Sequence, residues 1–227
     1  LMLFSRTFAA LRRMGNERLQ LPIFYESPLS LRFEIGDGTL STNHPHYFRS
    51  ALWRASFLFE NAPVFDTLLW VLYRTPDTDT DVDALLSAFC RLARLPGPAE
   101  VYTQATTDSD GEPLTRIFFF WDIQQTPPNA AALLDGIIHT DFHGCSEWSS
   151  AVFFLQTGEH PFLLHLYDDR GMDLVSDTTD ALLPFYQDCS NWLLDYDRPR
   201  KDAMFSSNTP PSAEPKPPAD CNGVDVF

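Results

Sequence analysis

The chain has 227 residues, of which 44% are hydrophobic and 14% aromatic, and its formal net charge is −15. This length and apolar content suffice for one well-packed core and exclude a disordered chain. No apolar run approaches the roughly 20 residues that a membrane-spanning helix needs, so the sequence predicts a soluble protein that does not enter the membrane.

The negative charge is concentrated in the middle of the chain. Residues 21–197 contain 26 acidic residues, eight arginines and no lysine, a formal charge of −18. Residues 1–20 carry four arginines and one glutamate, and residues 198–227 are neutral. A field of this sign repels nucleic acid and anionic membranes and accelerates encounter with a basic protein. The alternative interpretation is that the acidity only keeps the protein in solution.

The pattern of apolar residues predicts alternating helices and strands. In chain order, the predicted elements are a helix at 1–14, a strand at 30–35, a helix with Pro45 in its first turn, a strand at 67–73, a helix capped by the aspartates of 77–83, strands at 100–106 and 115–123, a helix at 129–140, strands at 150–156 and 162–167 with a continuation at 172–175, and a helix at 179–195. The strand at 67–73 is almost entirely apolar, which is typical of a strand covered on both faces.

These elements predict one α+β domain over residues 1–198, with a mixed or mostly antiparallel sheet and helices packed against it. From residue 199 onward the chain is rich in proline and small polar residues, a composition that cannot form a core. Residues 199–227 are therefore predicted to be a flexible tail. The four cysteines are widely separated and form no C-x-x-C pair, which favours a reducing cytoplasm.

Four segments carry a family resemblance across almost the whole body of the chain: Leu21–Tyr25, Leu31–Gly36, His165–Asp173 and Asn191–Arg198. Together they resemble the bacterial domain-of-unknown-function family numbered 3885, and the last two segments are the specific part. The resemblance implies a bacterial cytoplasmic protein. It brings no catalytic residues with it.

The strongest candidate site in the sequence is the run from Asp168 to Asp173. Asp168, Asp169 and Asp173 could hold a divalent metal or perform acid/base chemistry if their side chains converged. The alternative is a hairpin turn in which Gly171 takes a positive φ and Arg170 neutralises its neighbours. The alternative is the stronger interpretation.

Two further groups are candidates by spacing. Asp195 and Asp197 could pair with the turn around Arg170 if the two segments meet in space, which would also be a structural clamp. His139, His143 and Glu147 recur every four residues, as a metal-binding set on one helix would, but Gly144 interrupts that helix and favours an ordinary loop. No glycine-rich phosphate loop or nucleophile motif is present in the sequence, so no cofactor is expected.

The leading hypothesis is therefore an acidic protein-binding module, specifically an immunity or inhibitor protein that neutralises a basic toxin or enzyme. One competing hypothesis is a metal-dependent or acid/base enzyme that uses Asp168, Asp169 and Asp173. The other is a scaffold without catalytic activity. The sequence leaves the oligomeric state open.

Overall fold

The computed structural model describes residues 2–76, 80–108, 110–143 and 151–206. The helices are α1 (Leu3–Arg13), α2 (Ile23–Glu26), α3 (Tyr47–Glu60), α4 (Val82–Ala93), α5 (Ala130–Ile138), α6 (Thr140–His143), α8 (Thr179–Asp188) and α9 (Arg198–Phe205), with short 3-10 helices η1 (Ser190–Trp192) and η2 (Asp195–Asp197). The strands are β1 (Ser30–Glu34), β2 (Thr67–Arg74), β3 (Glu100–Thr107), β4 (Pro113–Asp122), β5 (Val152–Gln156), β6 (Phe162–Leu166) and β7 (Gly171–Ser176).

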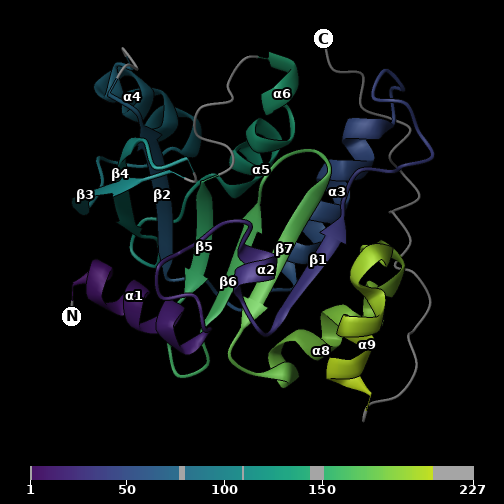
Figure 1. The fold of residues 1–227 in the computed structure, drawn as a ribbon. Coiled ribbons are helices and arrows are strands. Elements are labelled where there is room, and N and C mark those ends of the chain that lie inside the picture. Colours follow the sequence, from purple (N-terminus) through teal and green to yellow (C-terminus); the bar gives the residue numbers. More distant parts are fainter. Residues whose placement is uncertain (1, 77–79, 109, 144–150, 207–227) are drawn as a thin grey trace.

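The seven strands form one sheet in the order β1-β7-β6-β5-β2-β4-β3, and every neighbouring pair is antiparallel (Figure 1). The predicted α+β class with a mostly antiparallel sheet is thus confirmed. The segment predicted as a continuation of the strand at 162–167 is instead the separate strand β7. It turns back and pairs with both β6 and β1.

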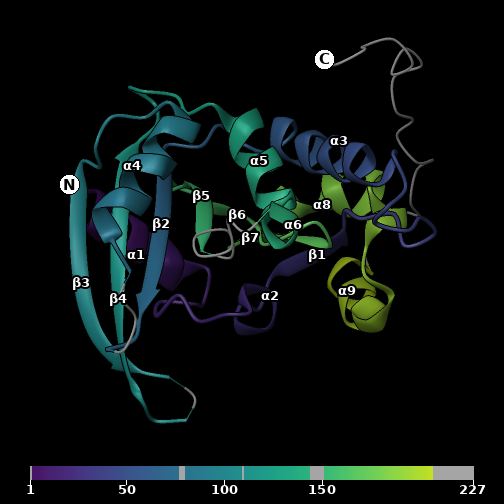
Figure 2. The same ribbon diagram turned by 90° about the horizontal axis from the view of Figure 1, so that it is seen from above.

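Helices cover both faces of the sheet (Figure 2). On β4, Phe120 contacts Phe4 of α1, with ring centroids 6.0 Å apart, and the next residue, Trp121, contacts Phe89 of α4 at 5.3 Å. Successive residues of a strand point to opposite faces, so α1 and α4 lie on opposite sides of the sheet. Burial on both faces explains why β2 and the 117–121 stretch of β4 are continuous apolar runs instead of alternating ones.

Three helix starts follow from local chemistry. The Asp81, Asn129 and Thr178 side chains each accept a hydrogen bond from a free backbone amide at the start of α4, α5 and α8. The predicted inclusion of Pro45 in the first turn of the second predicted helix is wrong, because the helix formed there, α3, begins at Tyr47 and has no side-chain cap. Asp77 and Asp79, the first members of the predicted capping segment, lie outside the described residues.

The C-terminal part of the domain differs from the prediction in two ways. The single helix predicted at 179–195 ends at Asp188 and is followed by η1 and η2. The chain then forms α9, in which Lys201 and Phe205 are buried, so the described domain extends to residue 206 and the boundary at 198/199 is too early. Tertiary contacts order a segment whose composition resembled a linker. The predicted tail beyond it, residues 207–227, lies outside the described residues.

Over the described ranges, no helix has both the length and the apolar character to cross a membrane.

Candidate functional site

The four segments that carry the family resemblance meet around the pairing of β1 with β7. Arg32 of β1 lies opposite Asp173 of β7, which in turn lies opposite His165 of β6. Directly opposed residues point to the same face of a sheet, so these three side chains form one row. The α2 helix contacts both β1 and β7, and the Leu194 amide bonds the Arg32 carbonyl at 3.0 Å.

Arg32 and Asp173 form a buried ion pair with two hydrogen bonds. Arg32 Nε donates to one carboxylate oxygen and Nη2 donates to the other, each at 2.7 Å. Asp173 is 0% exposed, and the Phe24 backbone amide also bonds its carboxylate. The rings of Phe24, Tyr25 and Tyr167 lie 5.1, 5.4 and 5.1 Å from the guanidinium carbon. Aromatic faces thus complete the shell around the cation.

Burial and pairing act in opposite directions on the pKa values of these two groups. Burial raises the pKa of the Asp173 carboxyl, and the hydrogen bonds and charge of Arg32 counteract that rise. Burial lowers the pKa of Arg32, but its hydrogen bond to Asp173 and that charge outweigh burial, so the net pKa is raised. The guanidinium therefore stays charged, and its charge is what makes a buried carboxylate tolerable at this position.

A small cavity lies beside the ion pair. Its volume is about 240 Å³, and it is lined by Leu21, Pro22, Arg32, His165, Tyr167 and Asp173. His165 is buried and stacks on Phe153, with ring centroids 4.5 Å apart. Burial and the nearby charge of Asp173 raise the pKa of Tyr167, so its phenol keeps its proton at neutral pH. The cavity is smaller than the roughly 300 Å³ at which small-molecule sites begin, and its charged pair is mutually satisfied. This geometry favours a structural role.

The turn between β6 and β7 holds the other predicted carboxylates. The Asp168 carboxylate accepts hydrogen bonds from the backbone amide of Arg170 and from its Nε, both at 2.8 Å. Asp169 is buried and accepts a 2.6 Å hydrogen bond from the Tyr47 hydroxyl of α3. The interpretation of this segment as a turn in which Arg170 neutralises a neighbour agrees with these contacts.

One detail of that interpretation is wrong. Among the described glycines, positive φ occurs at Gly15 and Gly111, and not at Gly171. Gly171 is already the first residue of β7, where it pairs with Glu34 in extended conformation. The position needs a glycine for space, because a Cβ there would overlap the hydroxyl of Tyr167.

The carboxylates that converge are not the predicted trio. Ligand-capable oxygens of Asp141, Asp168 and Asp169 lie within 4.8 Å of one another, and Asp141 comes from α6. Asp173 is committed to Arg32 in the interior of the sheet. Arg170 Nη2 lies 3.9 Å from Asp141 and also bonds Asp168, so a guanidinium already supplies positive charge to this group. The arrangement is that of a neutralised turn.

Asp195 and Asp197 do not meet Arg170, which pairs with Asp168 and Asp141 in the described structure. Asp195 is exposed, and Asp197 accepts a 3.1 Å hydrogen bond from the Tyr25 hydroxyl. Tyr25 is 46% exposed and Tyr196 is 84% exposed. We call Tyr25, Asp195, Tyr196 and Asp197 the tyrosine–aspartate patch. It lies at the junction of the α2 segment with η2.

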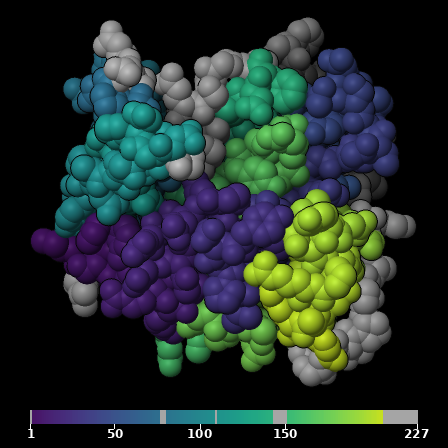
Figure 3. Space-filling view, viewed as in Figure 1, coloured from purple at the N-terminus to yellow at the C-terminus, as the bar shows by residue number. Residues whose placement is uncertain are grey.

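Lys201 of α9 links β1 to the segment that precedes η2. It is fully buried, and its ammonium donates to the Leu194 carbonyl at 2.7 Å and to the Arg32 carbonyl at 3.4 Å. Burial lowers the pKa of Lys201 to about 8. The space-filling view shows α9, in yellow, packed directly against the purple N-terminal segments (Figure 3).

The predicted histidine set is not aligned on one helix. α5 ends at Ile138 and α6 begins at Thr140, so the chain breaks its helical path at His139. His139 Nδ1 lies 2.9 Å from the Asp135 carbonyl, and its ring stacks on Phe48 at 4.5 Å. His143 is the last residue of α6, and Glu147 lies outside the described residues.

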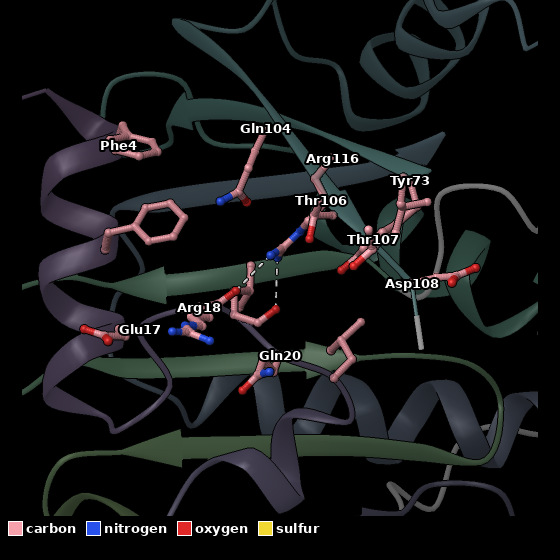
Figure 4. A pocket seen from close by; sticks show the side chains of 14 residues that line it. Phe4, Glu17, Arg18, Gln20, Tyr73, Gln104, Thr106, Thr107, Asp108 and Arg116 are labelled. Carbon is pink, nitrogen blue, oxygen red and sulfur yellow. Dashed lines mark hydrogen bonds between the residues drawn. The ribbon is translucent and has the colours of Figure 1, made fainter. Parts of the chain in front are cut away.

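A larger cavity of about 770 Å³ lies between α1 and strands β3 and β4, and Leu21 lines both this cavity and the small one (Figure 4). Phe4 and Phe8 of α1 line one side, and Gln104 and Thr106 of β3 line another. Arg116 spans its floor and donates to the backbone carbonyls of the segment at 18–19, at 2.9 and 3.0 Å. Its lining holds two arginines, Arg18 and Arg116, and two acids, Glu17 and Asp108, so the cavity has no net charge that would select a charged ligand.

Several residues of the site were not among those predicted, and they include Arg32, Tyr47 and Lys201. The sequence offered one indication for Arg32, because it is a charged residue between two apolar residues, Leu31 and Phe33, of a predicted strand. Nothing in the sequence connects Tyr47 with Asp169 or Lys201 with Arg32. Those contacts span 122 and 169 residues.

Comparison with known proteins agrees with the resemblance of these segments. The family described as a domain of unknown function, DUF3885, matches residues 8–197. Comparisons with curated proteins and with solved structures returned no match. The matched range includes α2, β1, the β6–β7 turn and η2, which together build the Arg32–Asp173 junction. The chain therefore belongs to the DUF3885 family of domains of unknown function.

Proposed function

We propose that the protein is an acidic binding module, an immunity or inhibitor protein that neutralises a basic toxin or enzyme. The observation that carries the proposal is the charge of residues 21–197, which hold 26 acidic residues against eight arginines and no lysine. An imbalance of this size steers a basic partner toward the protein and accelerates the encounter. It also suppresses binding of acidic competitors.

The fate of the motif carboxylates supports binding over catalysis. Asp168, Asp169 and Asp173 each bond a side chain of the same chain: Arg170, Tyr47 and Arg32, respectively. Acid/base chemistry needs a carboxylate that can exchange a proton with a substrate, and these are held in structural contacts. The charge that a partner meets is therefore on the exposed acids.

The tyrosine–aspartate patch has the features of an interface anchor. Tyr196 and Tyr25 are exposed aromatic side chains, and tyrosine is enriched among residues that dominate binding energy. Asp197 bonds the Tyr25 hydroxyl, and Asp195 adjoins Tyr196 in the chain. The Tyr25 ring rests on the Arg32 guanidinium at 5.4 Å, and its hydroxyl bonds Asp197, so this half of the patch is ordered before a partner arrives. Such order reduces the entropy cost of binding.

The test uses a basic protein encoded beside this chain's gene, since an inhibitor is normally encoded next to its toxin. Affinity is measured at low and at high salt with the full chain, and co-expression tests whether the chain suppresses toxicity. We expect affinity to fall steeply with salt because the attraction is screened over about 10 Å at 0.1 M salt. Tyr196→Ala is expected to weaken binding at least about tenfold, within the range of an interface hot spot.

The contribution of Asp195 to binding is tested with Asp195→Asn, and Glu159→Gln is its matched control. Both changes remove one exposed negative charge, but Glu159 lies in the β5–β6 turn, away from the patch. Equal small losses of affinity in both variants would agree with the effect of net charge but would contradict the tyrosine–aspartate patch as the binding site. Salt-independent affinity for the partner would overturn the proposed function.

A further inference from the structure

The fold covers one edge of its sheet and leaves the other open. At the β1 edge, Phe33 forms a bridge with Leu193, and the Leu194 amide bonds the Arg32 carbonyl at 3.0 Å. Lys201 Nζ reaches the same carbonyl. At the opposite edge lies β3, which pairs with β4 on one side and with no other strand of the described chain (Figure 2). A row of unpaired amides and carbonyls at such an edge is a template for another strand.

The sequence of β3 carries none of the usual protection. Edge strands normally avoid unwanted pairing through lysine, proline, bulges or short length. β3 is eight residues long, and its residues after Glu100 are uncharged and contain no proline. The Glu100 carboxylate is turned to the start of α1, where it accepts the Leu3 and Phe4 amides at 2.7 and 3.0 Å. Six of its eight residues are exposed, Val101 among them at 50%, and Glu100 and Tyr102 are half-buried.

The register shows which backbone groups are available. Asp108 N donates to Glu112 O at 3.0 Å, so this opposed pair is a hydrogen-bonded one. Hydrogen-bonded pairs alternate along an antiparallel ladder, and the even-numbered residues of β3 therefore bond β4. The odd-numbered residues turn their amides and carbonyls outward: Val101, Thr103, Ala105 and Thr107.

We propose that β3 is a docking edge for an extended, lysine- or arginine-containing segment of a protein partner, which adds an eighth strand to the sheet. Charge selects this occupant. Exposed Asp108, Asp110 and Glu112 stand at the open end of the β3–β4 hairpin, and the body of the molecule is strongly acidic. Two copies of the chain would bring these acids and their net charges of −15 together, which disfavours β3–β3 pairing. The basic character of the segment rests on the proposed function; the open edge does not.

The test uses the full chain and a nine-residue synthetic peptide that alternates lysine and valine, with amide hydrogen exchange read residue by residue by NMR. On peptide binding, we expect exchange at Val101, Thr103, Ala105 and Thr107 to slow about tenfold or more, equivalent to about 1.4 kcal/mol. The amides that bond β4 should change far less. A peptide of the same sequence that is N-methylated at every residue has no backbone donor on either edge, cannot form the ladder and should not bind. A glutamate–valine peptide tests the choice of charge.

Thr103→Pro removes one outward donor and no β3–β4 hydrogen bond, a position at which an edge strand tolerates proline. It should abolish peptide binding, whereas Thr103→Ala, which keeps the backbone donor, should bind as the natural chain does. If Thr103→Pro fails to fold, Ala105→Pro provides the same test two residues further on. A free chain whose odd-numbered amides are already protected, or that is a dimer by light scattering, would overturn the proposal, because the edge would then be filled.

The outcomes separate this inference from the proposed function. Binding of the basic partner that Thr103→Pro leaves unchanged overturns the docking edge and leaves the acidic binding module standing. Protection of β3 by the glutamate–valine peptide alone would overturn the basic segment.

Discussion

Replacing Arg32 by methionine tests whether the ion pair at the centre of the motif junction holds the fold together. The change leaves Asp173 with no exposure to solvent and with the Phe24 amide as its remaining hydrogen-bond donor among those identified at the carboxylate. Breaking a buried pair by removing one partner costs about 3–5 kcal/mol. Stabilities of whole domains are about 5–15 kcal/mol, so this single change should remove a large part of the total.

The structure also predicts an asymmetry between the two halves of the pair. Asp173→Leu leaves a guanidinium whose side chain is 14% exposed and which still faces three aromatic rings. Asp173→Leu should therefore lose less unfolding free energy than Arg32→Met, which leaves a fully buried carboxylate. The double variant, Arg32→Met with Asp173→Leu, should recover most of the loss, because apolar side chains of similar volume can replace a buried pair at little cost.

The measurement is urea unfolding followed by tryptophan fluorescence, with the four chains of the double-mutant cycle compared at pH 7 and pH 5. In Arg32→Met the pKa of Asp173 rises further, because Arg32 is what counteracts the effect of burial. A carboxyl with a raised folded-state pKa favours folding as the pH falls. The deficit of Arg32→Met relative to the natural chain should therefore shrink toward pH 5.

Arg12→Met is the matched control, since Arg12 pairs with Glu17 at the surface, where both side chains are mostly exposed. It should cost less than about 1 kcal/mol. Losses for Arg32→Met no larger than for Arg12→Met, or a double variant whose loss equals the sum of the single losses, would refute the reasoning.

Two further predictions concern the same junction. Tyr47→Phe should cost about 1.5–3 kcal/mol of unfolding free energy, because it removes a hydrogen bond to the buried Asp169 carboxylate. Tyr186→Phe is the control: it removes an exposed hydrogen bond to Asp202 and should cost less. Equal losses of unfolding free energy in the two variants would contradict the role given to burial. Lys201→Met tests the lowered pKa of Lys201, which is about 8 in the folded chain and ordinarily 10.5. Between these two pH values the unfolded chain binds more protons than the folded chain. The contribution of Lys201 to the free energy of unfolding therefore rises with pH. Denaturation midpoints at pH 7.5 and 9.5 should therefore rise in the natural chain relative to Lys201→Met, and parallel profiles would exclude this role.

Local sequence determined the main strands and some of the helix starts of this protein. Thr67–Tyr73 is apolar at nearly every position, and such a run can only be a strand covered on both faces or a buried helix segment. Asp81 was predictable as a helix cap because a cap acts on an amide only three residues away. The acidic body is equally a property of composition. These features need no knowledge of distant contacts.

Tertiary structure alone decided how the motif residues are used. The sequence groups Asp173 with Asp168 and Asp169 as a candidate cluster of carboxylates. The β1–β7 register instead places Asp173 against Arg32, 141 residues away, and buries it. Arg198–Phe205 has the composition of a linker and became α9, because Lys201 finds two backbone carbonyls and Phe205 finds the core. Spacing along the chain fixes which groups are neighbours within a turn or helix. Which charge is neutralised, and which is left for a partner, depends on register and burial, and those arise only when distant segments pack together.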